Sequence, residues 1–495
     1  MIRQRVASQA IDLSSLKSGR FLLPVAAALG SLIAYLLTMA PTAFPMDSAE
    51  MAAGAATLGI VHSPGYPVYL LLTHLFTHLP IGDLAFRANL ASAVFASLSV
   101  GLLVVLVRDM TGRALPAIVA GLGFGLCFYT WSLSVVAEVY TFQALLLIFL
   151  LLVLWRWRQS GQGTLLLSAA LVAGLAAANN PATVLWWPGL LLLIWTAPSR
   201  RLLKRSNVLK LAAAFLLGLA FILYIPIRSS ADPVVNYIGR FDSEGVFHRL
   251  DLSRPENLLW YLSGRQFGWA FFSYSVTELL GQAGRFGYQL FGGFFGAGLI
   301  IAGWGVWHKF GQRRWFVVGL LLVAACHSLF FISYRVPDKE TMFLPVYLIT
   351  AIFLGLGFAG MESQWLIPAR LTLPLLIVAM LVVNRPYADA SELTLPREMA
   401  QTRLGQAEPG AFYLAAWGDA AAMEYLQIAE GRRTDVKVIN ILMIAPDARR
   451  ELVHDALQNG KTVYSSFIDP ALKRGFEMVP IEYGYRVSDK SPQHS

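Results

Sequence analysis

The sequence predicts an all-α polytopic membrane protein with about eleven transmembrane helices and a small α/β domain at its C-terminus. Of the 495 residues, 56% are apolar and only 14% are charged, against about 25% charged residues in an average soluble domain. A chain with so few polar side chains cannot cover a globular surface, which excludes a soluble enzyme of this length. The chain has only two cysteines, Cys127 and Cys326, which excludes a disulfide scaffold, and both lie inside apolar runs.

Each predicted span approaches the length of about 20 residues that a helix needs to cross a bilayer. The predicted spans are 21–40, 86–107, 115–132, 139–155, 164–178, 182–197, 208–227, 286–307, 315–333, 342–360 and 366–384. The segment from Tyr66 to Leu79 is apolar but short and bounded by prolines, which predicts an interfacial or re-entrant helix. His74 and His78 lie one turn apart in this segment. They are either a metal-binding pair or the polar side of an amphipathic helix. The sequence offers no third ligand, which favours the amphipathic helix.

Lysine and arginine mark the cytoplasmic side of a membrane protein. With the predicted spans, the basic clusters all fall on one side. They comprise Arg3, Arg5, Lys17, Arg20, Arg108, Arg113, Arg156, Arg158, Arg200, Arg201, Lys204, Arg205, Lys210, Lys309, Arg313 and Arg314. We therefore expect a cytoplasmic N-terminus, a C-terminus outside, and a location in a bacterial inner (plasma) membrane. The net charge of +9 is then a topology signal, and we expect no nucleic-acid partner.

This orientation gives a transmembrane domain over 1–384, with two large outside loops, and a soluble tail over 385–495. The outside loops are loop one (41–85) and loop four (228–285). Strand and helix patterns alternate in the tail, which is typical of a parallel sheet. The predicted strands are 411–416, 436–441 and 462–467, and the predicted helices are 419–430 and 447–458. The tail contains no glycine-rich phosphate loop, so we expect it to bind an acceptor or to act as an accessory domain.

Loop one carries two carboxylates, Asp47 and Glu50, close to the end of the first span. Two interpretations remain open. The two acids have the spacing of a capping box at the start of an alanine-rich helix. They are equally a carboxylate pair at the membrane surface, in which one acid takes a proton from an acceptor hydroxyl and the other orients or binds the acceptor. Partial desolvation near lipid would raise the pKa of such a base.

The run from His62 to Pro67 contains two prolines and a glycine, which predict a tight turn. The turn is either a rigid lead into the next helix or a device that sets His62 and Tyr66 beside the carboxylates. In the second case His62 would hydrogen-bond the phosphate or the sugar of a donor.

Arg87 and Asn89 open the second span from the outside. An arginine at this depth is costly in lipid unless it is paired. Arg87 therefore binds a phosphate or pairs with Asp83 or Asp47, and these alternatives stay open.

Further polar groups recur at the outer ends of the spans. They are Glu138, Tyr140, Asn179, Arg228, Tyr334, Arg335 and Asp338. The arginines among them are either interfacial anchors or ligands for a phosphate, which the guanidinium contacts bidentately. For a lipid-phosphate donor arriving from the bilayer, Arg228 is the favoured group.

Taken in order, these motifs resemble the family of multispanning proteins related to vertebrate transmembrane protein 260. The resemblance rests on 47–50, 58–60, 62–67, 87–93, Trp131, 138–141, 179–180, 224–228 with 232–233, Tyr334, Asp338, 343–345, 418–419 and 433–436. Two positions depart from the family pattern, which commonly has glycine at Ala49 and proline at Ser63. Both lie in backbone-shaping positions and leave the acids and His62 in place.

The resemblance implies a GT-C type glycosyltransferase, similar to protein O-mannosyltransferases. Such an enzyme takes a sugar, here mannose, from a polyprenyl-phosphate carrier on the outer face of the membrane. It transfers the sugar with inversion to a hydroxyl, usually of a protein Ser or Thr, without a nucleotide sugar. The role of base then falls on Asp47, with Glu50 as its neighbour. The expected partners are the lipid-linked donor, an acceptor protein or glycan, and the bilayer; no cofactor and no metal are expected.

Three alternatives remain. A lipid or glycolipid transporter or flippase predicts inverted repeats and ionisable residues in mid-span. The predicted spans are almost free of charge, with Arg370 as the main exception, which favours surface chemistry. A non-enzymatic assembly protein would tolerate the loss of Asp47 and Glu50. A glycosyltransferase of this type would equally fit a lipid or glycan acceptor.

Overall fold

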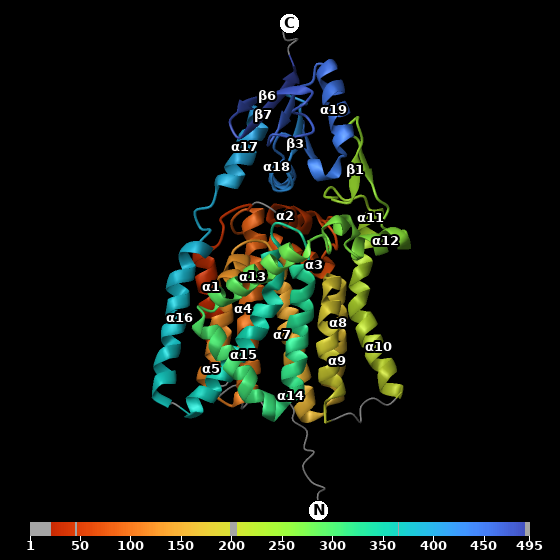
Figure 1. The fold of residues 1–495 in the computed structure, drawn as a ribbon. Helices are drawn as coiled ribbons and strands as arrows, with labels where there is room; N and C mark the ends of the chain where they lie inside the picture. Colours follow the sequence, from red (N-terminus) through yellow and green to blue (C-terminus); the bar gives the residue numbers. More distant parts are fainter. Residues whose placement is uncertain (1–20, 45–46, 199–204, 365, 491–495) are drawn as a thin grey trace, which may run out of the picture.

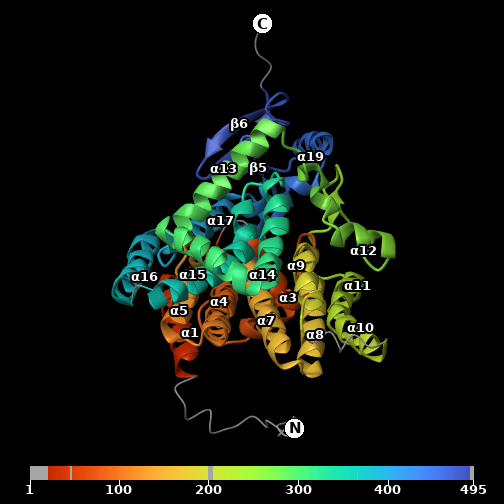
Figure 2. The same ribbon diagram turned by 60° about the horizontal axis from the view of Figure 1, so that its bottom comes forward.

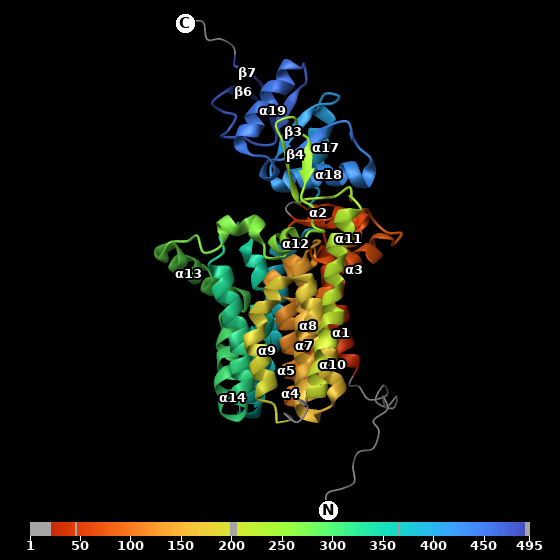
Figure 3. The ribbon, with the colours of Figure 1, turned by 90° about the vertical axis from the view of Figure 1, so that its right-hand side faces the viewer.

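The computed structural model describes residues 21–44, 47–198, 205–364 and 366–490, which form a helical bundle with an α/β domain stacked on one end (Figure 1). The same stacking is visible from two other directions in Figures 2 and 3. Part of the basic residues that predict the orientation lie outside the described residues, namely Arg3, Arg5, Lys17, Arg20, Arg200, Arg201 and Lys204.

The bundle consists of long apolar helices and several shorter ones. They are α1 (Leu22–Thr38), α4 (Leu84–Thr111), α5 (Ala114–Gly125), α6 (Phe128–Ser134), α7 (Val139–Ser160), α8 (Gly163–Asn179), η2 (Pro181–Trp186), α9 (Trp187–Trp195), α10 (Arg205–Leu219), η4 (Ala220–Leu223), α11 (Tyr224–Ser230), α14 (Ala297–Ile332), α15 (Leu344–Gln364) and α16 (Leu366–Ala388). Among the described residues, six helices are long and apolar enough to cross a membrane, or seven if one bent pair counts as a span. The total of about eleven spans stays a prediction.

The bent pair is α5 and α6, which covers the span predicted over 115–132 and turns by 62° at a short break. The break leaves carbonyl groups without helical partners, which is costly inside a membrane. Side chains of two other helices satisfy them. The Tyr35 hydroxyl donates to the carbonyl of Gly125 (2.8 Å), and the Asn384 amide donates to that of Leu126 (2.8 Å). The bend is therefore held in place by α1 and α16.

The prediction of one span over 286–307 is wrong. The structure divides this segment into the end of α13 (Val276–Gly293) and the start of α14. Phe295 and Gly296 between them have φ angles of 52° and 61°, which an α-helix does not accommodate. α13 projects sideways from the bundle (Figure 3).

α14 is 36 residues long but kinks at the non-helical residue Arg313. Before the kink, Gly305 lies against the backbone of Gly357 in α15, and after it Gly319 lies against Gly189 of α9. The two parts therefore pack on different neighbours, and the second matches the span predicted over 315–333. Glycines at both contacts allow the backbones to approach closely, as in many membrane helix pairs.

The tail adopts the alternating strand and helix pattern that the sequence predicts. Its elements are α17 (Leu395–Gln406), β3 (Phe412–Ala415), α18 (Trp417–Glu430), β4 (Lys437–Asn440), η7 (Ile441–Met443), α19 (Pro446–Gln458), β5 (Val463–Ser465), β6 (Phe476–Ile481) and β7 (Gly484–Asp489). β3 is parallel to β4 and β5, as expected. The antiparallel hairpin of β6 and β7 was not predicted, and it makes the sheet mixed, in the order β4-β3-β5-β7-β6. The predicted boundary at 384/385 falls inside α16, which ends at Ala388.

Short elements of the loops lie between the bundle and the tail. They are α2 (Asp47–Thr57), α3 (Pro67–Thr77), β1 (Gly239–Phe241), β2 (Phe247–Arg249), α12 (Pro255–Leu262), η5 (Arg265–Ala270) and η6 (Lys339–Phe343). α3 is the short helix predicted between two prolines. α2 lies across the end of the bundle, directly under α18 of the tail (Figure 1).

Polar contacts attach the tail to the start of α4. The backbone N–H of Ala85 donates to the Tyr425 hydroxyl (3.0 Å). Arg397 lies 3.1 Å from the carboxylate of Asp83 and also pairs with Glu430. The tail is therefore held over α2, which places it above the loop that carries the predicted acids.

We expect Gly305→Ala to loosen the packing of α14 on α15, because an added Cβ would meet the carbonyl oxygen of Phe353 at 2.1 Å. The expected loss is about 1–3 kcal/mol, measured as a lower melting temperature in detergent. Gly303→Ala on the same helix is the matched control, since its Cβ would meet nothing within 4 Å and alanine favours the helix. Equal melting temperatures of the two variants would contradict the packing described.

Candidate active site

The two predicted acids lie in the first turn of α2, where the helix dipole favours negative charge. Glu50 is fully buried, whereas the Asp47 side chain remains 18% exposed. The two carboxylates therefore differ in access although they are one turn apart. Of these two carboxylates, only that of Asp47 is accessible from solvent.

His62 joins both acids. Its backbone N–H donates to Oε1 of Glu50 (2.5 Å), and its ring Nδ1 lies 2.9 Å from Oε2 of the same residue. Its Nε2 lies 3.7 Å from Oδ2 of Asp47. Both ring nitrogens thus face a carboxylate, an arrangement that favours the protonated imidazolium. We call Asp47, Glu50 and His62 the carboxylate–histidine cluster.

Loop four fixes the turn that carries His62. The backbone N–H of Ser63 donates to Oε1 of Gln266 (3.1 Å), and the Ser63 hydroxyl donates to the carbonyl of Tyr261. The Tyr261 hydroxyl in turn donates to the carbonyl of Val61 (2.6 Å). Gly65 has φ +96°, and a Cβ there would lie 2.5 Å from that hydroxyl. A glycine is therefore required where the turn touches loop four.

Three aromatic rings from three parts of the chain surround the His62 imidazole. Tyr66 of loop one, Phe267 of loop four and Trp417 of the tail lie 5.6, 6.1 and 5.7 Å from it between ring centroids. Trp417 was not among the predicted site residues. It follows β3 directly, at the carboxyl end of a parallel strand, which is where functional groups collect in α/β sheets. This position after a predicted strand was the signal from which the sequence could have identified Trp417 as a site residue.

Two further carboxylates from distant helices share the electrostatic field of the cluster. Burial raises the pKa of Glu138 well above its usual range, and Asp47 and Asp338 add to the rise. Burial likewise raises the pKa of Asp338 to about 6, with Asp47 contributing. Ser92 of α4 holds Glu138 in place, since its hydroxyl accepts the backbone N–H of Glu138 (3.0 Å). The structure thus brings together all four of the predicted acids, Asp47, Glu50, Glu138 and Asp338.

Predicted tyrosines line the same region. Burial raises the pKa of Tyr66 well above its usual range, and the carboxylate of Asp47 adds to this. Tyr334 is buried, which raises its pKa, and the nearby charges of Asp338 and Asp47 raise the pKa further. Tyr140 is buried at the start of α7. These three tyrosines are therefore buried phenols, and two of them, Tyr66 and Tyr334, lie in the electrostatic field of Asp47.

Burial and the mutual charges of the cluster shift the pKa values of both Asp47 and His62. Burial raises the pKa of Asp47, while the His62 imidazolium lowers it and Glu50 raises it further. Burial lowers the pKa of His62, but Glu50 and Asp47 outweigh this effect and raise the pKa to about 10. His62 therefore stays protonated near neutral pH, and Asp47 gains basicity beside it.

Three predicted substrate ligands bind the protein itself instead. The Arg87 guanidinium donates to the carbonyls of Thr77 (2.8 Å), Ile81 (2.8 Å) and Gly82 (3.1 Å), so it braces the turn between α3 and α4. Neither proposed pairing of Arg87 with Asp83 or Asp47 occurs among the ion pairs of the described residues.

The two asparagines are also structural in this arrangement. Asn89 donates to the carbonyls of Ala40 (3.0 Å) and Thr42 (3.3 Å). Asn179 accepts the backbone N–H of Tyr69 (2.8 Å) and thereby satisfies a donor in the first turn of α3. Nothing in these contacts supports a role toward a substrate.

Arg228, the favoured phosphate ligand, caps the C-terminal end of α2. It donates to the carbonyls of Leu58 (2.6 Å) and Thr57 (3.2 Å), the exposed dipole end of α2. Arg335 pairs with Glu278 (2.8 Å) of α13. The cation next to Asp338 is Lys339, which is buried and donates to the Tyr274 hydroxyl (3.1 Å).

The cluster also has the composition of a metal site, because Asp47, Glu50 and His62 each offer a ligand atom within 4.8 Å of the others. A metal would have to displace a ring proton of His62, because Nδ1 faces Glu50 and Nε2 faces Asp47. His74 and His78 lie 3.2 Å apart between their Nε2 atoms. Among the described residues no third ligand joins that pair.

The raised pKa of His62 links stability to pH. The pKa is 6.5 in an unperturbed histidine and about 10 in the folded protein, so its contribution is complete below pH 6.5 and disappears as pH rises through 10. We expect the advantage of the wild type over His62→Gln in free energy of unfolding, on the order of a few kcal/mol, to shrink across this window. Denaturation at a series of pH values measures it, with the exposed His454→Gln as control. An advantage that does not change with pH would contradict the assignment.

Comparison with known proteins confirms the predicted resemblance in the N-terminal part of the chain. Residues 47–203 match the family described as Protein O-mannosyl-transferase TMEM260 N-terminal domain. The mouse (Mus musculus) protein named Protein O-mannosyl-transferase TMEM260 is 31% identical over 193 residues, which cover 37% of this chain and 27% of that protein. The chain thus spans about a quarter of the length of this curated relative.

Solved structures extend the likeness over nearly the whole chain. ArnT from Cupriavidus metallidurans bound to undecaprenyl phosphate is 13% identical, with a TM-score of 0.60, and the match covers 95% of this chain and 98% of that chain. The apo state of the same protein gives a TM-score of 0.55 at 14% identity. The bundle and tail therefore have a fold like that of ArnT, and residues 47–203, which contain the carboxylate–histidine cluster, are similar to the N-terminal domain of TMEM260.

Proposed function

We propose that the chain is a glycosyltransferase that moves a sugar, mannose, from a polyprenyl-phosphate carrier to the hydroxyl of a protein Ser or Thr. One observation carries this proposal. Of the two acids in α2, Glu50 has both oxygens bound to His62, whereas Asp47 keeps an exposed edge beside the imidazolium. A reachable carboxylate with a fixed partner is what activation of a hydroxyl requires.

In the proposed reaction, Asp47 takes the proton of the acceptor hydroxyl as that oxygen bonds to the anomeric carbon. The bond from that carbon to the phosphate oxygen breaks, and its electron pair leaves with the phosphate, which inverts the carbon. Glu50 holds His62, and His62 orients Asp47. Glu50 is thus a positioning residue, and Asp47 is the proposed catalytic one.

The proposed donor is supported by two features. The fold is like that of ArnT, which has been solved with undecaprenyl phosphate bound. Lys339 is buried next to Asp338 and has no carboxylate partner among the ion pairs of the described residues, and we propose that it binds the donor phosphate. The proposal includes transfer on the outer face of a bacterial inner membrane, with the tail outside.

One test of the proposed function concerns the base. With purified protein, a polyprenyl-phosphate mannose and a Ser/Thr peptide, we expect Asp47→Asn to lower kcat by 10²-fold or more, on the order of a general base. Glu50→Gln should keep part of the activity, because its amide oxygen still accepts from His62. Asp242→Asn in the exposed β1–β2 hairpin is the control for an acid elsewhere. Full activity in both Asp47→Asn and Glu50→Gln would sink the proposal.

Another test concerns the absence of a metal requirement. We propose that the imidazolium of His62 occupies the place a cation would take between the acids. Prolonged dialysis against EDTA should therefore leave kcat and the melting temperature unchanged. Loss of activity that Mn²⁺ or Mg²⁺ restores would instead show that Asp47, Glu50 and His62 act as metal ligands.

A further inference from the structure

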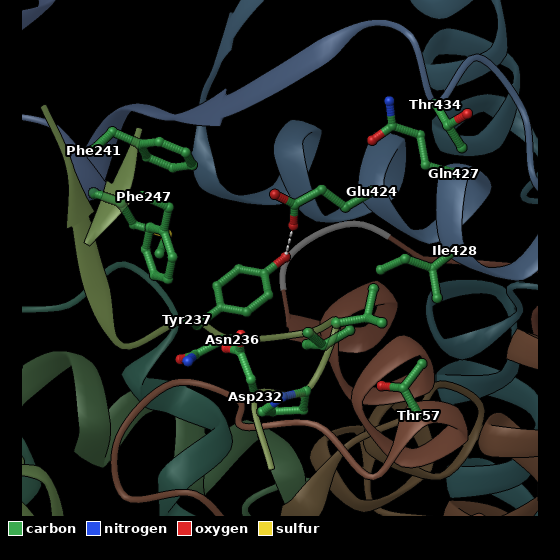
Figure 4. A pocket seen from close by; sticks show the side chains of 14 residues that line it. Thr57, Asp232, Asn236, Tyr237, Phe241, Phe247, Glu424, Gln427, Ile428 and Thr434 are labelled. Carbon is green, nitrogen blue, oxygen red and sulfur yellow. Dashed lines mark hydrogen bonds between the residues drawn. The ribbon is translucent and has the colours of Figure 1, made fainter. Parts of the chain in front are cut away.

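A cavity of about 620 Å³ lies where loop four meets the tail. Figure 4 shows Phe241 and Phe247 entering it from the β1–β2 hairpin and Glu424 from α18. Thr57, the last residue of α2, lines its side toward the bundle. Binding cavities commonly form at such junctions between domains, and this one adjoins the helix that carries Asp47.

The lining chemistry excludes the phosphate donor. Among the described residues that line the cavity there is no lysine or arginine, whereas Asp232 and Glu424 are acidic. Asp232 pairs with Arg249 (2.7 Å), but Glu424 has no basic partner among the ion pairs of the described residues and accepts only from the Tyr237 hydroxyl. A cavity with an uncompensated acid attracts a cation and repels a phosphate.

Aromatic contacts connect the cavity to the carboxylate–histidine cluster. The rings of Tyr237 and Trp417 lie 5.2 Å apart, and Trp417 lies 5.7 Å from His62. Burial raises the pKa of Glu424 to about 7, which the Tyr237 hydroxyl lowers and Glu50 raises. Tyr237 and Trp417 therefore form a thin wall between the cavity and the proposed base.

The backbone beside the cavity favours a polypeptide over a sugar. Ile60 donates to the carbonyl of Val235 (2.8 Å) and accepts from the N–H of Tyr237 (2.9 Å). Asn236 forms an isolated parallel bridge with Ile60; because backbone groups alternate in direction along extended backbone, its own N–H and C=O point away from Ile60, and Asn236 lines the cavity. An extended peptide adds to such an edge by main-chain hydrogen bonds.

We propose that this cavity binds the segment of an acceptor polypeptide that flanks its hydroxyl residue, with an apolar side chain against Phe241 and Phe247 and a basic side chain at Glu424. The proposal rests on the proposed function. α2 has 11 residues from Asp47 to Thr57, a rise of about 15 Å. About five extended residues cover that distance, so the basic residue lies up to about five positions from the modified hydroxyl.

Kinetics with peptides of about thirteen residues around one Thr tests this. We expect Glu424→Gln and Phe247→Ala to raise the acceptor KM about tenfold and to leave kcat within about twofold. Glu424→Gln keeps an acceptor for the Tyr237 hydroxyl, so the fold is preserved. Glu244→Gln in the turn of the same hairpin, outside the cavity lining, is the matched control. In a peptide that carries one Lys within about five positions of the Thr, replacing that Lys by Ala should raise KM for the wild type but not for Glu424→Gln.

Binding of a fluorescent peptide to the full chain without donor separates the two proposals. Weaker binding to Glu424→Gln than to Glu244→Gln supports the cavity even if no transfer occurs, in which case the proposed function alone fails. Transfer with an unchanged KM in both cavity variants would overturn the cavity proposal and leave the function standing. Competition by an oligosaccharide, with no peptide binding, would also overturn it.

Discussion

The site depends on the buried contact between Glu50 and His62. A carboxylate that is fully out of water is very costly unless charge and hydrogen bonds compensate it, and His62 supplies both through its backbone N–H and its ring. This contact ties α2 to the turn that begins at His62. Loop four then closes on the turn through Gln266 and Tyr261. Every other feature of the site is placed relative to that fixed pair.

The position of the pair at the end of the bundle gives two acids different tasks. Glu50 points into the protein and is saturated, while Asp47 lies on the open side of the same helix. Glu138, just before α7, and Asp338, just before η6, are distant in the sequence but both interact electrostatically with Asp47. Under the proposed function, a lipid-borne donor would reach this level from the bilayer and a water-borne acceptor would reach it from under the tail, so that the two meet at the membrane surface.

Hydropathy and turn residues predicted much of this arrangement because they act locally. The apolar runs, the Pro-Gly turn after His62 and the strand and helix alternation of the tail all have short-range causes. The span over 286–307 was wrong because its hydropathy is continuous across Phe295 and Gly296, where the backbone turns. Arg228 was expected to bind a phosphate, and Arg87 to bind a phosphate or to pair with Asp83 or Asp47. The partners of both arginines are carbonyl groups, which no residue pattern displays.

The sequence by itself determined the class of the protein, the apolar helices and the set of acids and aromatic residues near loop one. These follow from composition and from spacing within one segment. Only the tertiary structure decided that Asp47 is the accessible acid, that Trp417 of the tail faces His62, and that Tyr237 and Glu424 line a cavity beside it. Residues this far apart in the chain meet because helices and domains pack, and packing depends on the whole fold rather than on any local pattern.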